Sequence, residues 1–130
     1  MVPVKSVMIP LEKIRTMDRD MSIRAGAEHL RDYNIGSLFV TKASEIIGIL
    51  TDTDIVRRCV AAALDPNKAT VDQIMSAPIV MIDENKTLLD ANDLMAQSHV
   101  RHLGVSRNSK LVGMISVRDL VVFLTNLPRK

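Results

Sequence analysis

The sequence has few aromatic residues and a single cysteine, and both shortages narrow the possible functions. Aromatic residues make up 2% of the 130 residues, with no tryptophan, which leaves little for stacking on single-stranded nucleic acid. Cys59 is the one cysteine, so an intrachain disulfide is excluded and we expect a reducing, cytoplasmic compartment. No apolar run approaches the ~20 residues that span a bilayer, and the N-terminus lacks the apolar core of a signal peptide. We therefore expect a soluble intracellular protein with no membrane partner.

A strong excess of charge of one sign is also missing. Seventeen Lys and Arg residues stand against fifteen Asp and Glu residues, for a net charge of +2. The basic residues are spread along the chain, so a nucleic-acid partner is not predicted. Apolar residues, in contrast, make up 47% of the sequence. The chain is long enough to bury a core as one compact unit, or as two small units that share one.

The chain contains an internal repeat. Residues 35–40 (IGSLFV) match residues 100–105 (VRHLGV) at an offset of 65 residues, and the same offset carries GILTDTDI at 48–55 onto GMISVRDL at 113–120. Farther upstream, VKSVM resembles VDQIM at a slightly larger offset. We predict two tandem repeats, residues 1–65 and 66–130. Since one repeat is small for an independent core, we expect the halves to pack on each other.

Each repeat predicts the element order β-α-β-β-α. A short extended segment comes first, and Ser22 or Thr87 is then placed to cap a helix whose apolar residues recur at helical spacing. Two strands joined by a short polar turn follow, and a second helix begins after Thr51 or Ser116. The expected strands are residues 37–41 and 46–50 in the first repeat, and 102–106 and 111–115 in the second.

The pair Thr51 and Asp54, repeated as Ser116 and Asp119, admits two interpretations. The spacing fits a capping box, in which the hydroxyl and the carboxylate satisfy amides of the first helical turn. The same geometry suits a ligand, because a helix N-terminus binds anions and an ionised carboxylate can accept hydrogen bonds from the adjacent hydroxyls of a ribose. The residues by themselves leave both interpretations open, and the two can coexist.

The repeated segments resemble a tandem pair of CBS domains, the regulatory module named after cystathionine beta-synthase and also called a Bateman module. The resemblance covers almost the whole chain. It is carried by VMIP, IGSLFV and GILTDTDI in the first repeat, and by IMSAP, VRHLGV and GMISVRDL in the second. The family often has proline before the valine of the first hairpin strand, where this chain has Phe39 and Gly104. The resemblance implies an α+β fold of two motifs related by a pseudo-two-fold axis, with their sheets packed face to face.

The resemblance also implies a site for an adenosine-containing ligand such as AMP, ADP, ATP, NAD or S-adenosylmethionine. In similar pairs the hydroxyl and the aspartate of one repeat hold the ribose, while phosphate-binding groups come from the other repeat. The Thr51/Asp54 cleft would then receive its phosphate contacts from Arg101, His102 and Arg118. Because arginine suits bidentate phosphate binding, a phosphorylated adenosine is expected to prefer this cleft.

The second implied cleft, at Ser116 and Asp119, would face small neutral groups. Its counterparts from the first repeat are Gly36, Ser37 and Thr53, so it would be empty or hold a less charged ligand. Contacts to the base are expected near Ile79 and Val80 in the first cleft, and near Ile14 in the second.

Catalysis is not predicted. The sequence has no visible nucleophile–base pair and no phosphate-cradling glycine loop. His99 and His102 lack a partner at metal-ligand spacing, so no metal and no required cofactor are expected.

The expected role is regulatory, and the expected partners are proteins. The partly apolar stripe at residues 121–124 needs cover, which together with the resemblance predicts a homodimer. With no room for an effector domain, a ligand that shifts a conformational population would signal to a separate, unknown protein. The alternative is a dimerisation or partner-binding module whose clefts bind nothing.

Overall fold

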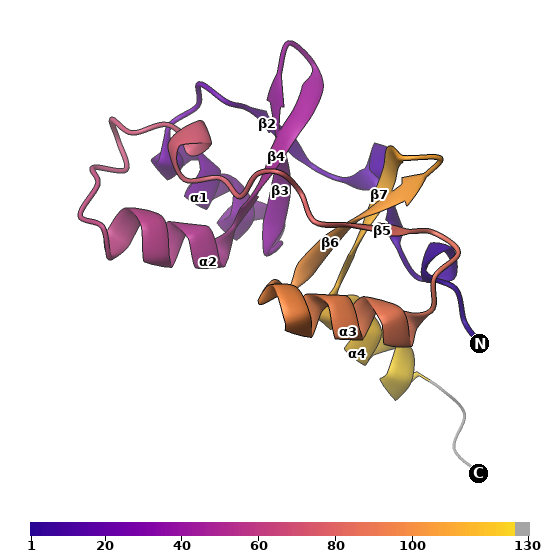
Figure 1. Ribbon diagram of the computed structural model, residues 1–130. Coiled ribbons are helices and arrows are strands. Elements are labelled where there is room, and N and C mark those ends of the chain that lie inside the picture. The colour runs from indigo at the N-terminus through magenta and orange to yellow at the C-terminus, as the bar shows by residue number, and fades with distance from the viewer. Residues whose placement is uncertain (127–130) are drawn as a thin grey trace. The chain divides into compact units, whose positions relative to one another are not determined.

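The computed structural model describes residues 1–126, and they fold as two compact units (Figure 1). Unit 1 joins Met1–Ile14 to the chain from Val80 onward, and unit 2 is Arg15–Ile79. The first segment of each sequence repeat therefore folds with the other repeat. Residues 1–14 belong to the unit of the second repeat, and the segment before Val80 belongs to the unit of the first.

Unit 2 is built on a three-stranded sheet in the order β2-β3-β4. Strand β2 runs parallel to β3, and β4 pairs with β3 as an antiparallel hairpin. Its elements are β2 (Thr16–Asp18), α1 (Ile23–Tyr33), β3 (Ser37–Lys42), β4 (Glu45–Thr51), the single turn α2 (Asp52–Asp54), a π-helix (Ile55–Val60) and a 3₁₀ turn (Val71–Gln73). The core is formed mainly by Ile23, Leu38, Val40, Leu50, Cys59, Val71 and Ile74.

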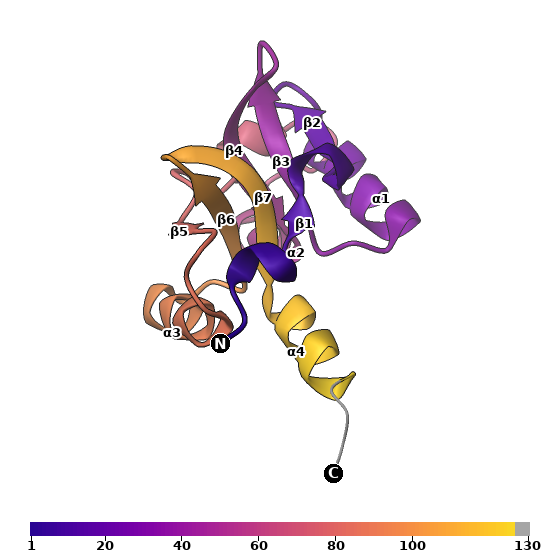
Figure 2. The ribbon, with the colours of Figure 1, turned by 90° about the vertical axis from the view of Figure 1, so that its right-hand side faces the viewer.

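Unit 1 repeats this plan with one extra strand, in the order β1-β7-β6-β5. The N-terminal segment supplies that strand, and Figure 2 shows it beside β7. The elements are 3₁₀ turns at Val4–Ser6 and Leu11–Lys13, β1 (Ile9–Pro10), β5 (Met81–Asp83), α3 (Leu88–Ser98), β6 (His102–Arg107), β7 (Lys110–Ser116) and α4 (Val117–Thr125). The core is formed mainly by Val4, Ala91, Met95, Leu103, Val105 and Ile115.

The predicted α+β class, element order and hairpins are confirmed. The first helix of each repeat also begins at its predicted cap: Ser22 Oγ accepts a hydrogen bond from Ala25 N at 3.0 Å, and Thr87 Oγ1 accepts one from Asp90 N at 3.1 Å. The hairpin of unit 2 turns through Ala43 and Ser44, both with positive φ. Two such residues match the right-handed twist of paired strands. The packing of one sheet against the other stays a prediction.

Two features were not predicted. Strand β1 is only two residues long, too short to leave a periodic pattern in the sequence. The second helix of unit 2 continues as a π-helix, whose backbone hydrogen bonds span five residues, as in Ala61 N to Val56 O at 2.9 Å.

Within residues 1–126, every helix falls short of the length and apolar character that a membrane crossing requires.

Candidate functional site

Both hydroxyl–aspartate pairs form capping boxes, as one of the two interpretations predicts. In unit 2, Thr51 Oγ1 accepts from Asp54 N at 3.1 Å, and Thr51 N donates to Asp54 Oδ2 at 3.0 Å. In unit 1, Ser116 Oγ accepts from Asp119 N at 3.2 Å, and Ser116 N donates to Asp119 Oδ2 at 2.8 Å. A cap uses one carboxylate oxygen. The capacity for a ligand therefore depends on what the other oxygen contacts.

The second oxygen of Asp54 is already engaged. Asp54 is 6% exposed, and its Oδ1 accepts a hydrogen bond from Ser76 Oγ at 2.9 Å. Arg58 Nε lies 3.8 Å from the same oxygen, and Arg58 Nη1 donates to Met75 O at 3.1 Å. Asp54 therefore connects the start of the second helix to the segment around residue 76, and Thr51, Ser76 and Arg58 surround its carboxylate.

The corresponding oxygen of Asp119 is not engaged in this way. Both hydrogen bonds from Ser116, at 2.8 and 2.9 Å, go to Oδ2. None of the hydrogen bonds described among residues 1–126 uses Oδ1. The reason lies in β1: Ile9 pairs with Met114, whereas Ser76 pairs with the equivalent Ile49, so an aliphatic side chain replaces the serine hydroxyl. Asp119 is half-buried and keeps the capacity to accept from a ligand hydroxyl.

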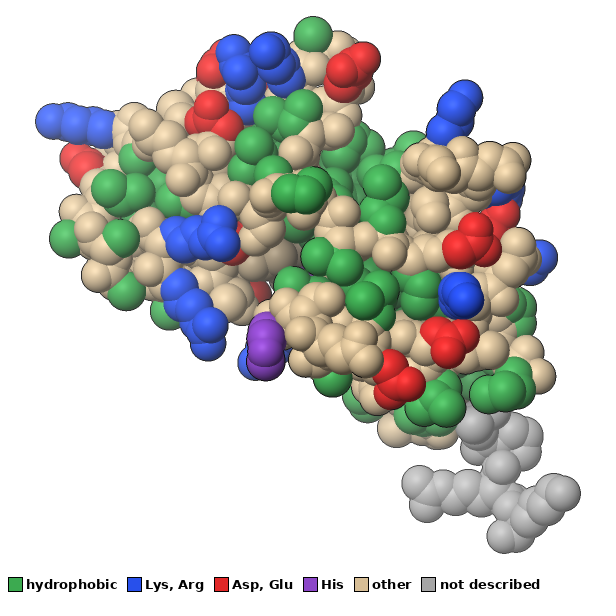
Figure 3. All heavy atoms as spheres, viewed as in Figure 1, with side chains coloured by type: hydrophobic (Ala, Val, Ile, Leu, Met, Phe, Trp, Pro, Cys, Tyr) green, Lys and Arg blue, Asp and Glu red, His purple; other side chains and the backbone are tan. Residues whose placement is uncertain are grey.

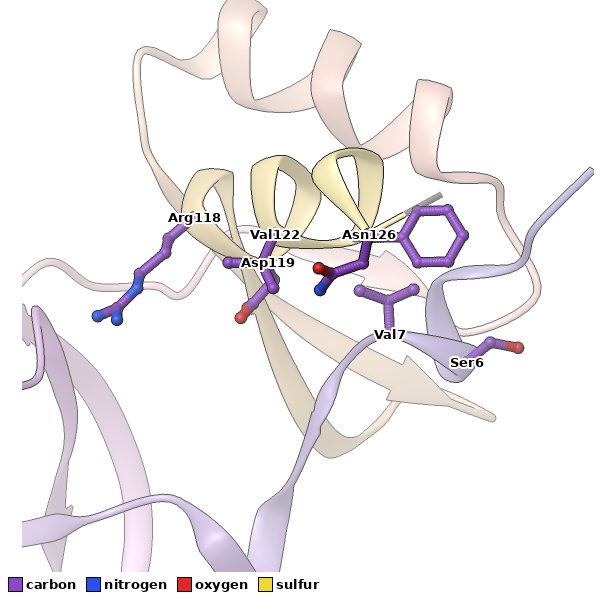
Figure 4. A pocket seen from close by; sticks show the side chains of 7 residues that line it. Ser6, Val7, Arg118, Asp119, Val122 and Asn126 are labelled. Carbon is purple, nitrogen blue, oxygen red and sulfur yellow. The ribbon is translucent and has the colours of Figure 1, made fainter. Parts of the chain in front are cut away.

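Asp119 lies in an open groove of unit 1 with a volume of about 310 Å³. Figure 4 shows side chains of α4 on one side of this groove and the N-terminal segment on the other. The lining residues are Ser6, Val7, Arg118, Asp119, Val122, Phe123 and Asn126. A volume near 300 Å³ is at the lower end for small-molecule sites, which are mostly apolar with a few polar groups that fix orientation. Here Val7, Val122 and Phe123 are the apolar groups, and Asp119 is the anionic one.

Three predicted phosphate-binding residues lie around the start of α4. Arg118 lines the groove, although its side chain extends away from the other labelled residues (Figure 4). His102 pairs with Ser116 across β6 and β7, and the carbonyl of Arg101 accepts from Val117 N at 3.0 Å. The structure thus brings all three together with Ser116 within unit 1. Their predicted role toward Thr51 and Asp54 stays a prediction.

The residues predicted to contact a base are partly exposed. Ile14 ends the N-terminal segment of unit 1, and Ile79 ends unit 2. Both are half-buried. Val80 is also half-buried, and its carbonyl accepts from Gly104 N at 2.9 Å. That bond extends the parallel pairing of β5 with β6 by one residue, so the backbone of Val80 has a structural role.

Several residues that decide the geometry around the two aspartates were not among the predicted site residues. No role at a ligand site was predicted for Ser76, Arg58, Ser6, Val7 or Asn126, and Val122 and Phe123 were expected only in the apolar stripe at residues 121–124. A signal was present in VKSVM and VDQIM, because extending that match by one residue sets Ile9 against Ser76. The offset of 65 likewise sets Arg58 against Phe123. These two differences between the repeats distinguish the surroundings of Asp54 from those of Asp119.

A separate ion pair stabilises the other end of β6. The carboxylate of Glu84 is buried, and its two oxygens accept from Arg107 Nε at 2.5 Å and Arg107 Nη2 at 3.1 Å. The hydrogen bonds from the guanidinium hold the pKa of Glu84 below its ordinary value of 4.5. Since β6 begins at His102 and ends at Arg107, this pair lies at the end of the strand away from Ser116 and contributes to the framework.

The residue types that commonly bind metal ions do not cluster in the described part of the chain. Across the described range 1–126, His, Cys, Asp and Glu do not gather in a group of three or more that could hold a metal ion.

Comparisons with known proteins agree with the repeat and the fold. CBS domain-containing protein YhcV of Bacillus subtilis is 32% identical over 110 residues, which cover 85% of this chain and 78% of that protein. An uncharacterized conserved protein from Pyrococcus horikoshii has a TM-score of 0.88 over 99% of this chain and 96% of its own. At 23% identity, that likeness shows the fold alone.

Two further solved structures are more similar in sequence. A protein with CBS domains from Burkholderia ambifaria, whose name proposes a role in signal transduction, is 26% identical, with a TM-score of 0.82 over 91% of this chain and 88% of its own. A hexameric CBS-CP12 protein from bloom-forming cyanobacteria is 25% identical, with a TM-score of 0.81 over 99% of this chain and 76% of its own.

The model of the CBS domain family matches the sequence twice, at residues 4–61 and 71–126. Residues 62–70 separate the two matches. The chain belongs to the CBS domain family and carries two CBS domains in tandem.

Proposed function

We propose that the protein is a non-catalytic regulatory module that binds one adenosine-containing ligand in the groove of unit 1. The observation that carries the proposal is Oδ1 of Asp119, which none of the hydrogen bonds described among residues 1–126 uses and which lies beside the apolar side chains of Val7 and Phe123. The candidate ligands are AMP, ADP, ATP, NAD and S-adenosylmethionine. The choice of the Ser116/Asp119 site over Thr51/Asp54 rests on the contacts that already surround Asp54.

The groove residues suit the three parts of such a ligand. A ribose hydroxyl donates to Asp119 Oδ1, and a hydrogen bond to a charged group contributes about 1.5–3 kcal/mol. The adenine packs on Val7, Val122 and Phe123, which remain partly open to solvent. Arg118 is exposed, so its side chain can reorient on the picosecond-to-nanosecond timescale to meet a phosphate or a carboxylate.

Signalling follows if the ligand binds one conformation better than another. The groove joins α4 to the N-terminal segment, so a bound ligand holds these two elements together. A tenfold preference for one state shifts the equilibrium by about 1.4 kcal/mol. In this proposal the shift is detected by a separate protein, which recognises the conformation of the module rather than the ligand itself.

Self-association is a second part of the proposal. Val121 is 52% exposed and Leu124 is 62% exposed on α4, and Val56 and Val60 are exposed on the π-helix. Figure 3 shows apolar side chains at the surface over α3, where Leu89 is 57% exposed. Exposed apolar stripes of this kind mark interaction sites, and a similar CBS protein is hexameric. We propose a homodimer that covers these stripes.

Thermal unfolding with added ligands tests the binding. AMP, ADP, ATP, NAD and S-adenosylmethionine are added singly to the wild type, Asp119→Ala and Asp54→Ala, and each shift in Tm is measured against the same variant without ligand. A ligand at ~100 times its Kd adds about 2.7 kcal/mol of stability, which raises Tm by several degrees in a domain of this size. The shift is expected in the wild type and in Asp54→Ala, and is lost in Asp119→Ala.

Two other results would change the proposal. A shift that Asp54→Ala abolishes and Asp119→Ala preserves would assign the site to Thr51 and Asp54, the cleft that the resemblance to CBS pairs favours for a phosphorylated adenosine. No shift with any of the five ligands, in protein free of copurified nucleotide, favours a ligand-free dimerisation or partner-binding module.

A further inference from the structure

The two units have equivalent elements around their aspartates, which permits a residue-by-residue comparison. The 3₁₀ turn Val71–Gln73 in unit 2 corresponds to Val4–Ser6 in unit 1. Ser76 pairs with Ile49 as Ile9 pairs with Met114, and Met75 and Met8 lie against the equivalent glycines Gly48 and Gly113. Each wall of the unit 1 groove therefore has a counterpart in unit 2. Val7 corresponds to Ile74, and Phe123 corresponds to Arg58.

In unit 2 those counterparts contact each other. The Arg58 guanidinium reaches from the π-helix to the carbonyls of Ile74 and Met75, at 3.4 and 3.1 Å from Nη1. The side chain thus crosses between the two elements that, in unit 1, form opposite sides of the groove. In unit 1 the equivalent side chain is Phe123, which has no donor and lines the open groove with Val7.

Ser76 blocks the carboxylate itself. Its hydroxyl donates to Oδ1 of Asp54 at 2.9 Å. In Asp119 the described hydrogen bonds of residues 1–126 go to Oδ2 and not to this equivalent oxygen. Asp54 is buried, and Arg58 Nε lies 3.8 Å from the same oxygen, so both acceptor directions of Oδ1 face protein donors. A ribose hydroxyl therefore has to displace one of these side chains, which then needs a new partner. A buried polar group without a partner is unfavourable. Arg58, whose side chain is 54% exposed, is the weaker of the two contacts.

We propose that Ser76 and Arg58 close the unit 2 counterpart of the groove and turn Asp54 into a structural cap, so that each chain binds a single ligand. This inference rests on the proposed function for its binding test. The two residues determine which repeat binds, since Ile9 and Phe123 at the equivalent positions leave the groove of unit 1 open. Exchanging the residues between the units exchanges the binding capacity.

Binding stoichiometry in two matched double variants tests the proposal. Ser76→Ile with Arg58→Phe gives unit 2 the residues of unit 1, and Ile9→Ser with Phe123→Arg makes the reverse change. Equilibrium dialysis with AMP, ATP and S-adenosylmethionine, each used alone, measures ligand bound per chain. We expect one ligand per chain for the wild type, two for the first variant and none for the second. Circular dichroism and thermal unfolding verify that both variants fold, and Arg57→Phe is the control for an added aromatic residue beside Arg58.

Two stoichiometries would overturn the proposal: two ligands bound by the wild type, or one ligand bound by a folded Ser76→Ile/Arg58→Phe variant. If the wild type binds none of the three probes, and neither ADP nor NAD in the same dialysis, the proposed function fails, and a measurement without ligand decides the role of Ser76. In a double-mutant cycle with Ser76→Ala and Asp54→Asn, the unfolding equilibrium constant is expected to change non-additively by at least about twofold. Additive changes would show that Ser76 does not hold Asp54, and would overturn the inference whatever the ligand result.

Discussion

Gly113 of β7 and Ile9 of β1 approach so closely that a Cβ atom on Gly113 would lie 2.6 Å from the carbonyl oxygen of Ile9. A side-chain atom cannot occupy that space unless the backbone moves. The absence of a side chain at Gly113 is therefore what lets the N-terminal segment pair with β7. The same segment carries Val7 into the groove, so this contact between two backbones positions one wall of the candidate site.

Gly113→Ala is expected to destabilise the protein and to loosen β1. Overpacking of a tight contact typically costs about 1–3 kcal/mol, and here the neighbour is backbone, which yields less readily than a flexible side chain. Urea unfolding followed by circular dichroism measures the change, with Lys110→Ala in an exposed part of the same strand as the control. A loss of stability no greater than that of Lys110→Ala would mean that β1 is not held against β7 as described.

Thr87→Ala is expected to weaken α3. Thr87 forms a capping box with Asp90, and the hydrogen bonds from the backbone and hydroxyl of Thr87 hold the pKa of Asp90 below its ordinary value of 3.8. Replacing a capping threonine with alanine costs about 0.5–2 kcal/mol. Thr125→Ala, near the end of α4, removes an exposed hydroxyl that donates to Val122 O and is the control. Equal effects of the two substitutions on the midpoint of urea unfolding would argue against the cap.

The Glu84–Arg107 pair predicts a loss of stability in acid. Because the pKa of Glu84 is lower in the folded chain than its ordinary value of 4.5, the folded state binds the proton less readily than the unfolded state. This contribution is complete above that ordinary value and is lost as the pH falls through the lower folded pKa. The free energy of unfolding, measured from neutral pH down to about pH 3, is expected to fall more steeply in the wild type than in Glu84→Gln. Parallel curves would assign the acid sensitivity to other carboxylates.

Leu124→Lys is expected to weaken self-association without unfolding α4. The side chain of Leu124 is 62% exposed in the single chain, so a lysine there meets water in the monomer and is buried only at an interface, where an unpaired charge is unfavourable. Sedimentation velocity measures the change in mass. Asn85→Lys adds the same charge in an exposed turn and is expected to leave the mass unchanged. A Leu124→Lys protein with the wild-type mass would place the interface elsewhere.

Much of the fold could be predicted from short sequence patterns, such as helix N-cap residues and apolar strand segments. Ser22 and Thr87 are N-cap residues ahead of apolar residues at helical spacing, and both cap helices in the structure. The strands of each hairpin are apolar runs with β-branched residues on both sides of a short polar turn. Such signals depend on residues close in sequence, and they predicted the order of elements, while the α+β fold of two related motifs was implied by the resemblance to CBS pairs.

The surroundings of the two aspartates depend on contacts between distant residues. Thr51 and Ser116 begin equivalent capping boxes, so the sequence around one looks like the sequence around the other. The surroundings of the two aspartates differ because Ser76 donates to Asp54, 22 residues away in the sequence. Ser76 is part of the second repeat in sequence but folds into unit 2 with the first repeat. A pattern search within one repeat does not reveal that exchange, and the two-residue strand β1 gives no periodic signal of its own.

The most direct measurement is an NMR titration of isotope-labelled protein with AMP and, separately, with S-adenosylmethionine, following the assigned backbone amides. The account predicts that the largest chemical-shift changes from at least one of these ligands fall at residues 6–7 and 118–126, while the amides of Thr51, Asp54 and Arg58 change little. Changes centred on residues 51–58 would contradict the assignment of the site to unit 1. The absence of saturable changes with both ligands would contradict binding of these adenosine ligands and leave self-association as the better account of the module.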